Sequence, residues 1–311
     1  MKFPLSASWK RALLLLSIAC VTSESQAALL LYEGFAGYTT GTVLYNQNIN
    51  GSSTGFTGAW SGNTASQTNG TVSASGLAFG SLLQTSGGSY VNNGSTVVLG
   101  STIALAGATS GTVWTSYLVR FNGAHNNTAG NGFEIRIGDS AGGADVVRFR
   151  TFADTRTGTS NVVGADFNTT DLSNIGDSTD PVLATSTNYI MISSFTNVAG
   201  ASGSGTATTW ALTASQFQAM IESPLGAETY LTTATASQYF AKASNTDTVK
   251  TTDQIESGDF LQIVNVGNNI ALDEIRMGTT LDDVIPVVPE PGSAMLTFAS
   301  AALLLRRTRR A

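Results

Sequence analysis

The feature that most constrains the fold is a series of short segments in which apolar and polar residues alternate. These segments are bounded by Gly, Asn or Ser, and a period of two is that of a half-buried β-strand. Regular strands joined by glycine-rich turns predict an all-β fold, either a sandwich or a jelly roll. The expected strands are Val113–Phe121, Phe133–Ile137, Val146–Phe152, Tyr189–Phe195, Phe260–Val266 and Ile270–Met277.

The clearest of these segments assigns its side chains to two faces. Phe133, Ile135 and Ile137 lie on one face of the expected strand, and Glu134 and Arg136 lie on the other. The apolar face is therefore expected to point into a core.

One segment predicts a helix. In Thr213–Glu222, Thr213 and Gln216 have the spacing of a capping box, and Pro224 follows the end. Because the helix is short and isolated among strands, we expect it to decorate a loop rather than to build the core.

The first 27 residues have the order of a secretory signal peptide. Lys2, Lys10 and Arg11 are basic, Ala12–Val21 is apolar, and Ser25–Ala27 places small residues at a cleavage site. The alternative is a buried N-terminal helix. The sequence therefore predicts an exported protein.

Cleavage after Ala27 would remove Cys20, the one cysteine of the chain, so the mature protein would have no disulfide and no thiol chemistry. Lipid attachment at Cys20 is the alternative. With a single His as well, the chain cannot build a zinc site of the usual His/Cys kind.

The charge balance excludes further classes of partner. Acidic side chains outnumber basic ones 21 to 15, and charged residues are 12% of the chain. Nucleic acids and anionic lipids are therefore not expected as partners of the body. Residues 34–119 carry no charge at all, which leaves strand edges without charged residues that would oppose self-association.

The C-terminus combines three features in order. The tripeptide Pro289-Glu290-Pro291 precedes an apolar run of 14 residues, Gly292–Leu305. As a helix, this run would span about 21 Å, which is short of the roughly 30 Å hydrocarbon core of a bilayer. Basic residues then close the chain and favour a cytoplasmic end by the positive-inside rule. They are Arg306, Arg307, Arg309 and Arg310.

This tail, residues 288–311, resembles the PEP-CTERM sorting signal. The resemblance implies recognition by an exosortase-type membrane protease or transpeptidase, with transient membrane contact. It further implies delivery to the cell surface or extracellular matrix of a bacterium that makes exopolysaccharide. A plain tail anchor is the alternative. The expected organisation is a signal peptide over residues 1–27, one β-sandwich over 28–287 and the sorting tail over 288–311.

The two ends of the body carry a second resemblance. Leu31–Phe35 and Thr54–Trp60 near the start, and Leu272–Gly278 near the close, are similar to segments of concanavalin A-like, laminin-G-like jelly rolls. The resemblance implies that the first and last strands of the body pair side by side. The fold expected is thus a jelly-roll β-sandwich with one short decorating helix, a signal peptide and a hydrophobic sorting helix.

The motifs of catalysis are not found. In the jelly-roll glucanases that this fold resembles, one strand carries the pattern Glu-x-Asp-x-x-Glu. This sequence lacks that pattern. Asp273 and Glu274 are adjacent, so they point to opposite faces of a strand unless a bulge intervenes. His125 lies in a polar turn with no nucleophile elbow beside it. We therefore expect no enzymatic activity.

Calcium is the one cofactor for which the sequence offers a site. The loop Gly138–Asp145 provides the carboxylates of Asp139 and Asp145 together with bare carbonyl groups. Residues 166–180 form a second acidic region. The alternative is an ordinary hairpin turn, which uses the same residue types.

A glycan is the expected ligand of the body. Sugar sites use aromatic platforms, and Trp60, Trp114 and Trp210 supply the rings. Trp60 follows a glycine turn and is the candidate ligand-binding residue, whereas Trp114 lies mid-strand and is expected in the core. The leading hypothesis is a module that binds exopolysaccharide. A structural coat or adhesion protein acting by self-association is the alternative, and a glycan hydrolase is a third.

Overall fold

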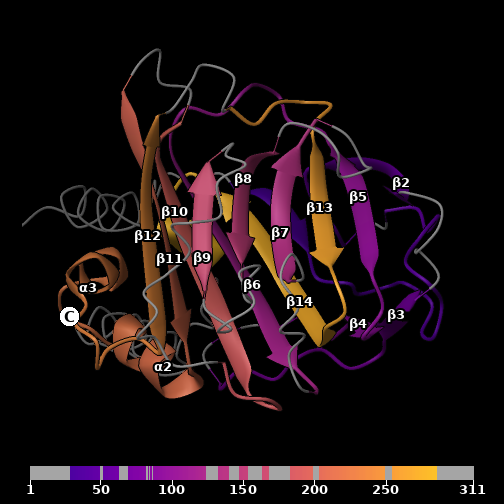
Figure 1. Ribbon diagram of the computed structural model, residues 1–311, viewed down its shortest axis with the longest axis horizontal. Coiled ribbons are helices and arrows are strands. Elements are labelled where there is room, and N and C mark those ends of the chain that lie inside the picture. The colour runs from indigo at the N-terminus through magenta and orange to yellow at the C-terminus, as the bar shows by residue number, and fades with distance from the viewer. Residues whose placement is uncertain are drawn as a thin grey trace, which may run out of the picture.

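The structure is a computed structural model in which the expected strands assemble into two antiparallel sheets (Figure 1). It describes residues 29–49, 52–62, 69–81, 83, 85, 87–123, 132–139, 147–152, 163–167, 183–198, 203–248 and 254–285. The expected signal peptide and sorting tail lie outside these residues.

The larger sheet has eight strands in the order β12-β11-β10-β6-β14-β4-β3, with β1 also paired to β14. Its central strands are long and apolar on both faces, as expected for strands that are covered on both sides. Its strands are β1 (Leu29–Glu33), β3 (Gly70–Ser73), β4 (Ser89–Asn93), β6 (Gly111–Phe121), β10 (Asn188–Val198), β11 (Ser204–Leu212), β12 (Ala241–Thr248) and β14 (Asn269–Gly278).

The smaller sheet has six strands in the order β2-β5-β13-β7-β8-β9, and it lies in front of the larger sheet in Figure 1. Its strands are β2 (Phe56–Gly62), β5 (Val97–Ile103), β7 (Phe133–Gly138), β8 (Val147–Phe152), β9 (Gly164–Phe167) and β13 (Phe260–Asn265). All six strands that the sequence predicted are confirmed.

The main hydrophobic core lies between the sheets. Phe133, Ile135 and Ile137 of β7 enter it, which confirms the inward face expected from alternation. Tyr117 of β6 meets Phe133 from the opposite sheet, with the ring centroids 5.9 Å apart in an edge-on arrangement. Such pairs add to the burial term that holds the two layers together.

The expected pairing of the first and last strands is confirmed. β1 pairs antiparallel with β14, with Tyr32 opposite Arg276 and Glu33 opposite Ile275. β4 occupies the other part of the same edge, where Leu272 lies opposite Tyr90. β14 therefore lies in the interior of the larger sheet, bonded to β6 on its other side.

One helix, Thr213–Glu222, was expected to decorate a loop rather than to build the core, and its place outside the core is wrong. The helix α2 (Ala214–Ile221) has the predicted capping box at Thr213. It packs with α3 (Ala227–Thr233) and α4 (Leu281–Val284) against the outer face of the larger sheet. Together they enclose a second core whose members include Trp114, Leu118, Ile190, Trp210, Leu212, Phe217, Met220, Leu231 and Val284.

Trp114 and Trp210 form the centre of this second core. Their rings stack with centroids 6.2 Å apart and an interplanar angle of 17°. Both side chains are buried, so the expectation that Trp114 belongs to a core is confirmed, although the core is the outer one. Neither ring is available as a surface platform for sugar.

Candidate functional site

The strongest candidate for a binding site is the outer face of the six-stranded sheet. β7 turns Glu134 and Arg136 to this face because its alternate residues enter the core. Arg136 and Glu134 form an ion pair through Nε and Oε2. A charged pair therefore occupies a sheet face at the middle of the molecule.

The neighbouring strands extend this pair into a row of polar residues. Gln262 of β13 lies opposite Arg136, and Arg150 of β8 lies opposite Arg136 on the other side. Asp166 of β9 in turn lies opposite Arg150. Strands are about 4.8 Å apart, so Gln262 and Asp166 are separated by about 14 Å. We call Gln262, Arg136, Glu134 and Asp166 the polar row; the side chain of Arg150 lies outside the description.

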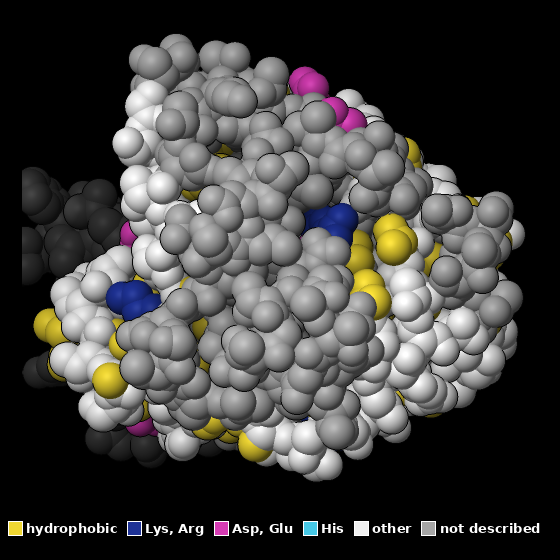
Figure 2. Space-filling view, in the orientation of Figure 1, with side chains coloured by type: hydrophobic (Ala, Val, Ile, Leu, Met, Phe, Trp, Pro, Cys, Tyr) yellow, Lys and Arg dark blue, Asp and Glu magenta, His cyan; other side chains and the backbone are white. Residues whose placement is uncertain are grey.

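The polar row is almost completely withdrawn from bulk solvent. Glu134 is 1% exposed and Arg136 is 6% exposed, and Gln262 and Asp166 are also buried. Burying an ion pair gives little net stability, because the desolvation cost offsets the attraction. Figure 2, which views this face, shows a group of Lys and Arg side-chain atoms near its middle. These four side chains are covered in the folded chain, so a ligand can reach them only where that cover opens.

The polar row can form hydrogen bonds in both directions. The guanidinium of Arg136 and the amide of Gln262 supply N–H donors, and the carboxylates of Glu134 and Asp166 supply acceptors. Hydrogen bonds to such charged groups are about twice as strong as neutral ones. A ligand that presents many hydroxyl groups matches this mixture of donors and acceptors.

The structure places Trp60, the ligand residue expected from the sequence, away from this face. Trp60 is 0% exposed and lies in the core between the sheets, where its Nε1–H donates to the Tyr38 hydroxyl at 3.0 Å. A ring in this position cannot stack on a sugar, so Trp60 is reassigned to the core. The glycine turn before it gave no information on which way the ring points.

The remaining site residues expected from the sequence are not brought together in the described residues. Asp139 is exposed at the end of β7, and Asp145, His125 and residues 168–182 lie outside the description. Asp166 was expected in an acidic loop but belongs to β9. The sorting residues Pro289, Glu290, Pro291, Arg306, Arg307, Arg309 and Arg310 also lie outside it.

The described ranges contain neither a metal-binding cluster nor a membrane-spanning helix. Over these ranges, no cluster of three or more His, Cys, Asp or Glu side chains has a geometry suited to a metal ion. Over the same ranges, no helix has both the length and the apolar character needed to cross a bilayer.

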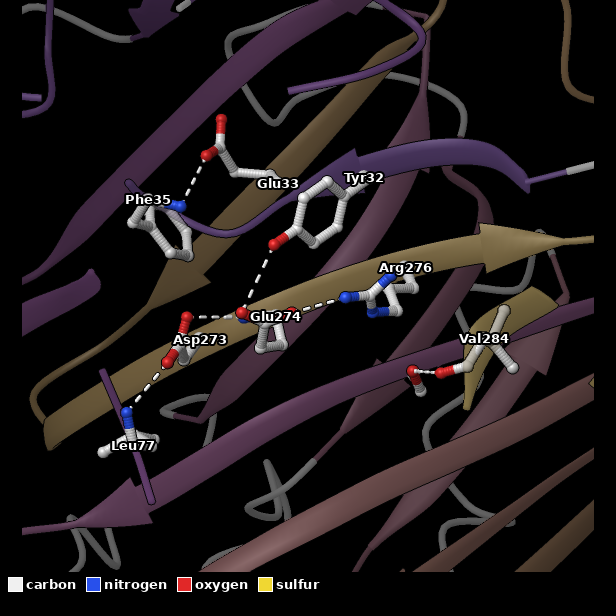
Figure 3. Close-up of polar contacts among 9 residues, drawn as sticks. Tyr32, Glu33, Phe35, Leu77, Asp273, Glu274, Arg276 and Val284 are labelled. Carbon is white, nitrogen blue, oxygen red and sulfur yellow. Dashed lines mark hydrogen bonds and ion pairs between the residues drawn. The ribbon is translucent and has the colours of Figure 1, made fainter. Parts of the chain in front are cut away.

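A second group of carboxylates lies where β1 meets β14. Glu33 is fully buried and accepts hydrogen bonds from the Phe35 N–H at 2.7 Å, the Tyr38 hydroxyl at 2.9 Å and the Ser53 hydroxyl at 3.0 Å. Burial raises the pKa of Glu33, and these donors oppose the rise. Figure 3 shows the bond from Phe35, whose backbone has a φ of 55°. Glu33 thus ties the chain that leaves β1 to the core.

Asp273 and Glu274 lie on β14 beside this point (Figure 3). A bulge between Asp273 and Arg276 interrupts the pairing with β6, and Glu274 has a φ of 53°. The bulge lets Glu274 bind Arg276 at 2.7 Å and accept from the Tyr32 hydroxyl at 3.3 Å. Asp273 accepts from the Leu77 N–H and from the Glu274 N–H, each at 2.8 Å. This group fastens the first and last strands of the body together.

The raised pKa of Asp273 predicts that the stability of the fold depends on pH. Burial, reinforced by the charge of Glu274, raises the pKa of Asp273 to about 8, against about 3.9 in an unfolded chain. Between these values the folded state holds a proton that the unfolded state releases. The free energy of unfolding should therefore fall as the pH rises from about 4 to about 8, by up to about 1.4 kcal/mol per pH unit.

Urea unfolding at several pH values in this range, with a chelator present to remove stray cations, measures the slope. The Asp273→Asn variant is the control, and its slope should be much smaller; the part contributed by Glu33 would remain. An equal slope in the variant and the natural protein would contradict the assignment to Asp273.

Comparison with known proteins gives a likeness of structure alone. No protein-family model matches the chain, and no curated protein matches it. The solved structures similar to it include lectins, a calreticulin domain and an alginate lyase. The globular domain of T. cruzi calreticulin is 11% identical with a TM-score of 0.45, and the match covers 90% of this chain and 100% of that domain.

Two further similar structures are a lectin and a lyase. Lectin II from Ulex europaeus is 11% identical with a TM-score of 0.35, covering 69% of this chain and 94% of the lectin. The alginate lyase Aly36B is 13% identical with a TM-score of 0.36, covering 80% and 96%. At these values the likeness assigns neither a ligand nor an activity to this chain.

Proposed function

We propose that this chain is an exported cell-surface or extracellular-matrix protein whose β-sandwich binds exopolysaccharide without altering it. The observation that carries the proposal is the polar row, in which Arg136, Glu134, Gln262 and Asp166 share the outer face of the six-stranded sheet. Once its cover opens, the row supplies what sugar hydroxyl groups need, since each hydroxyl both donates and accepts a hydrogen bond. Its length of about 14 Å is enough to contact more than one sugar of a chain.

The register around Glu134 supports binding without hydrolysis. A retaining glycosidase needs a second carboxyl group about 5 Å from the first. The positions directly opposite Glu134 are Val264 on β13 and Phe152 on β8. Glu134 is also engaged by Arg136, whose Nε forms an ion pair with its Oε2.

Export and sorting complete the proposal. The signal-peptide pattern over residues 1–27 directs the chain out of the cytoplasm. The Pro-Glu-Pro motif, the short apolar run and the terminal arginines of residues 288–311 favour release or transfer by an exosortase-type enzyme. The body would then act at the cell surface or in the matrix, where exopolysaccharide is found.

Affinity electrophoresis of the purified protein in gels containing a neutral β-glucan or alginate tests the binding. The test variant combines Glu134→Gln with Arg136→Gln, because removing both charges together leaves neither member of this ion pair as a buried ion without the other. Affinity should fall by about 10- to 100-fold, the effect of losing hydrogen bonds to charged groups.

Lys242→Gln is the matched control. It removes one positive charge from β12 of the larger sheet, where Lys242 lies over the Trp210 ring at 5.4 Å, and should leave the mobility shift unchanged. Equal retardation of the double variant and the natural protein would show that the glycan does not bind at the polar row. No retardation in either gel, combined with concentration-dependent assembly, would favour the structural coat instead.

A further inference from the structure

The last described segment of the chain is held tightly against the body. Helix α4 begins after Thr280, whose side chain forms a reciprocal capping box with Asp283. Oδ2 of Asp283 also accepts from the Thr279 N–H at 2.9 Å and the Thr280 N–H at 2.8 Å. The start of α4 is therefore fixed by its own side chains.

The end of α4 is fixed by the sheet. Leu281, Val284 and Ile285 are all buried in the second core. The Ser116 hydroxyl of β6 donates to the Val284 carbonyl at 2.5 Å, a bond drawn beside Val284 in Figure 3. We call α4 with Ile285 the latch. The folded body thus extends to Ile285.

The sequence places the sorting motif immediately after the latch. Only residues 286–288 separate Ile285 from Pro289. Fully extended, the chain from Ile285 to Pro289 spans about 14 Å. An enzyme that cuts near Pro289 must hold residues on both sides of the bond in an extended form. Residues 286–288 would be bound in the cleft of the enzyme. No free residues would then remain to span the distance from that cleft to the buried Ile285.

We propose that the latch is an inhibitory contact that must open before the sorting enzyme can process the chain, an inference that rests on the proposed sorting function. Opening frees residues 279–285 and lengthens the available chain from four to more than ten residues. Because such openings are rare excursions of a folded protein, the rate of processing follows the population of the open state. The partner of this surface is the membrane-bound processing enzyme.

Two substitutions open the latch by different means. Ser116→Ala removes the hydrogen bond to Val284 and should raise the open population about tenfold. Gly278→Ala places a Cβ 2.2 Å from the Asp283 Cβ, which pushes α4 away from β14. Amide hydrogen exchange at Thr279 and Thr280 in the purified protein reads the opening directly, and both variants should exchange at least about tenfold faster.

Processing is measured by pulse-chase in cells that express an exosortase-type enzyme, with the mature C-terminus identified by mass. At natural spacing, Ser116→Ala should be processed about tenfold faster than the natural protein. A second pair of chains carries about six Gly/Ser residues inserted after Ile285, which supply the reach without opening. In this pair, the chain that keeps Ser116 and the chain with Ser116→Ala should be processed equally fast. Replacing the four tail arginines with Gln provides the unprocessed control.

Each outcome decides between distinct claims. Faster processing of Ser116→Ala at natural spacing, abolished by the insertion, supports the latch. Equal rates of Ser116→Ala and the natural protein at natural spacing overturn the latch while leaving sorting intact. If the chains with the insertion are not processed either, the proposed sorting is wrong and the latch falls with it.

Discussion

Replacing Gly55 with alanine is expected to destabilise the protein by at least about 3 kcal/mol, one of the largest effects available from a single methyl group. Gly55 has a φ of +79°, which L-residues rarely adopt, and a Cβ there would lie 2.0 Å from the Leu30 carbonyl oxygen. The neighbouring Thr54 bridges β1 by exchanging backbone hydrogen bonds with Tyr32. The clash is with backbone, so it cannot be relieved by a side-chain rotation.

Gly58 is the matched control for this substitution. It has nearly the same φ of +81°, but no atom lies within 4 Å of a Cβ built on it. Gly58→Ala should therefore cost only the conformational strain, about 1–2 kcal/mol. Urea unfolding of both variants separates strain from collision. Similar losses in the two variants would show that the close approach of β1 to Gly55 is not the cause.

Replacing Phe217 with alanine should cost about 3–5 kcal/mol, as for a large residue of a well-packed core. Phe217 lies on the buried face of α2, and its ring meets that of Phe79 edge-on with centroids 5.6 Å apart. If α2 were only a decoration, the loss would be small. Thermal or urea unfolding of the purified variant gives the value directly.

Leu225 provides the control within the same helical region. Its side chain is 62% exposed, so Leu225→Ala should change the free energy of unfolding by no more than about 0.5 kcal/mol. A comparably small loss for Phe217→Ala would contradict the second core. A large loss of unfolding free energy for Phe217→Ala, with little loss for Leu225→Ala, would show that the helices stabilise the outer face of the larger sheet.

The strands could be predicted from alternation, but the second core could not be read from it. In Val113–Phe121, Val113 and Tyr117 enter the core between the sheets, whereas Trp114 and Leu118 enter the outer one. A strand that is apolar on both faces requires cover on both sides. The helix with its capping box was correctly predicted by local signals, yet what it covers depends on β6, β10 and β11 lying side by side.

The candidate site shows the same division between local and distant information. Alternation alone places Glu134 and Arg136 on one face of a strand. It does not reveal that Gln262, more than a hundred residues away, lies opposite Arg136, because the register is fixed only when β7 and β13 pair. Trp60 was expected at the surface but lies in the core, since a ring after a glycine turn can point inward as readily as outward.

The position of β14 has a consequence for how the protein is made. Among the described residues β14 is the last strand, yet it lies between β6 on one side and β1 and β4 on the other. Its contacts with β1 join residues about 240 positions apart, as in the bond from Tyr32 to Glu274. Contacts between such distant residues form late and slowly. The larger sheet cannot close until β14 has been synthesised, so the two-sheet sandwich forms only after nearly all of the body has been made.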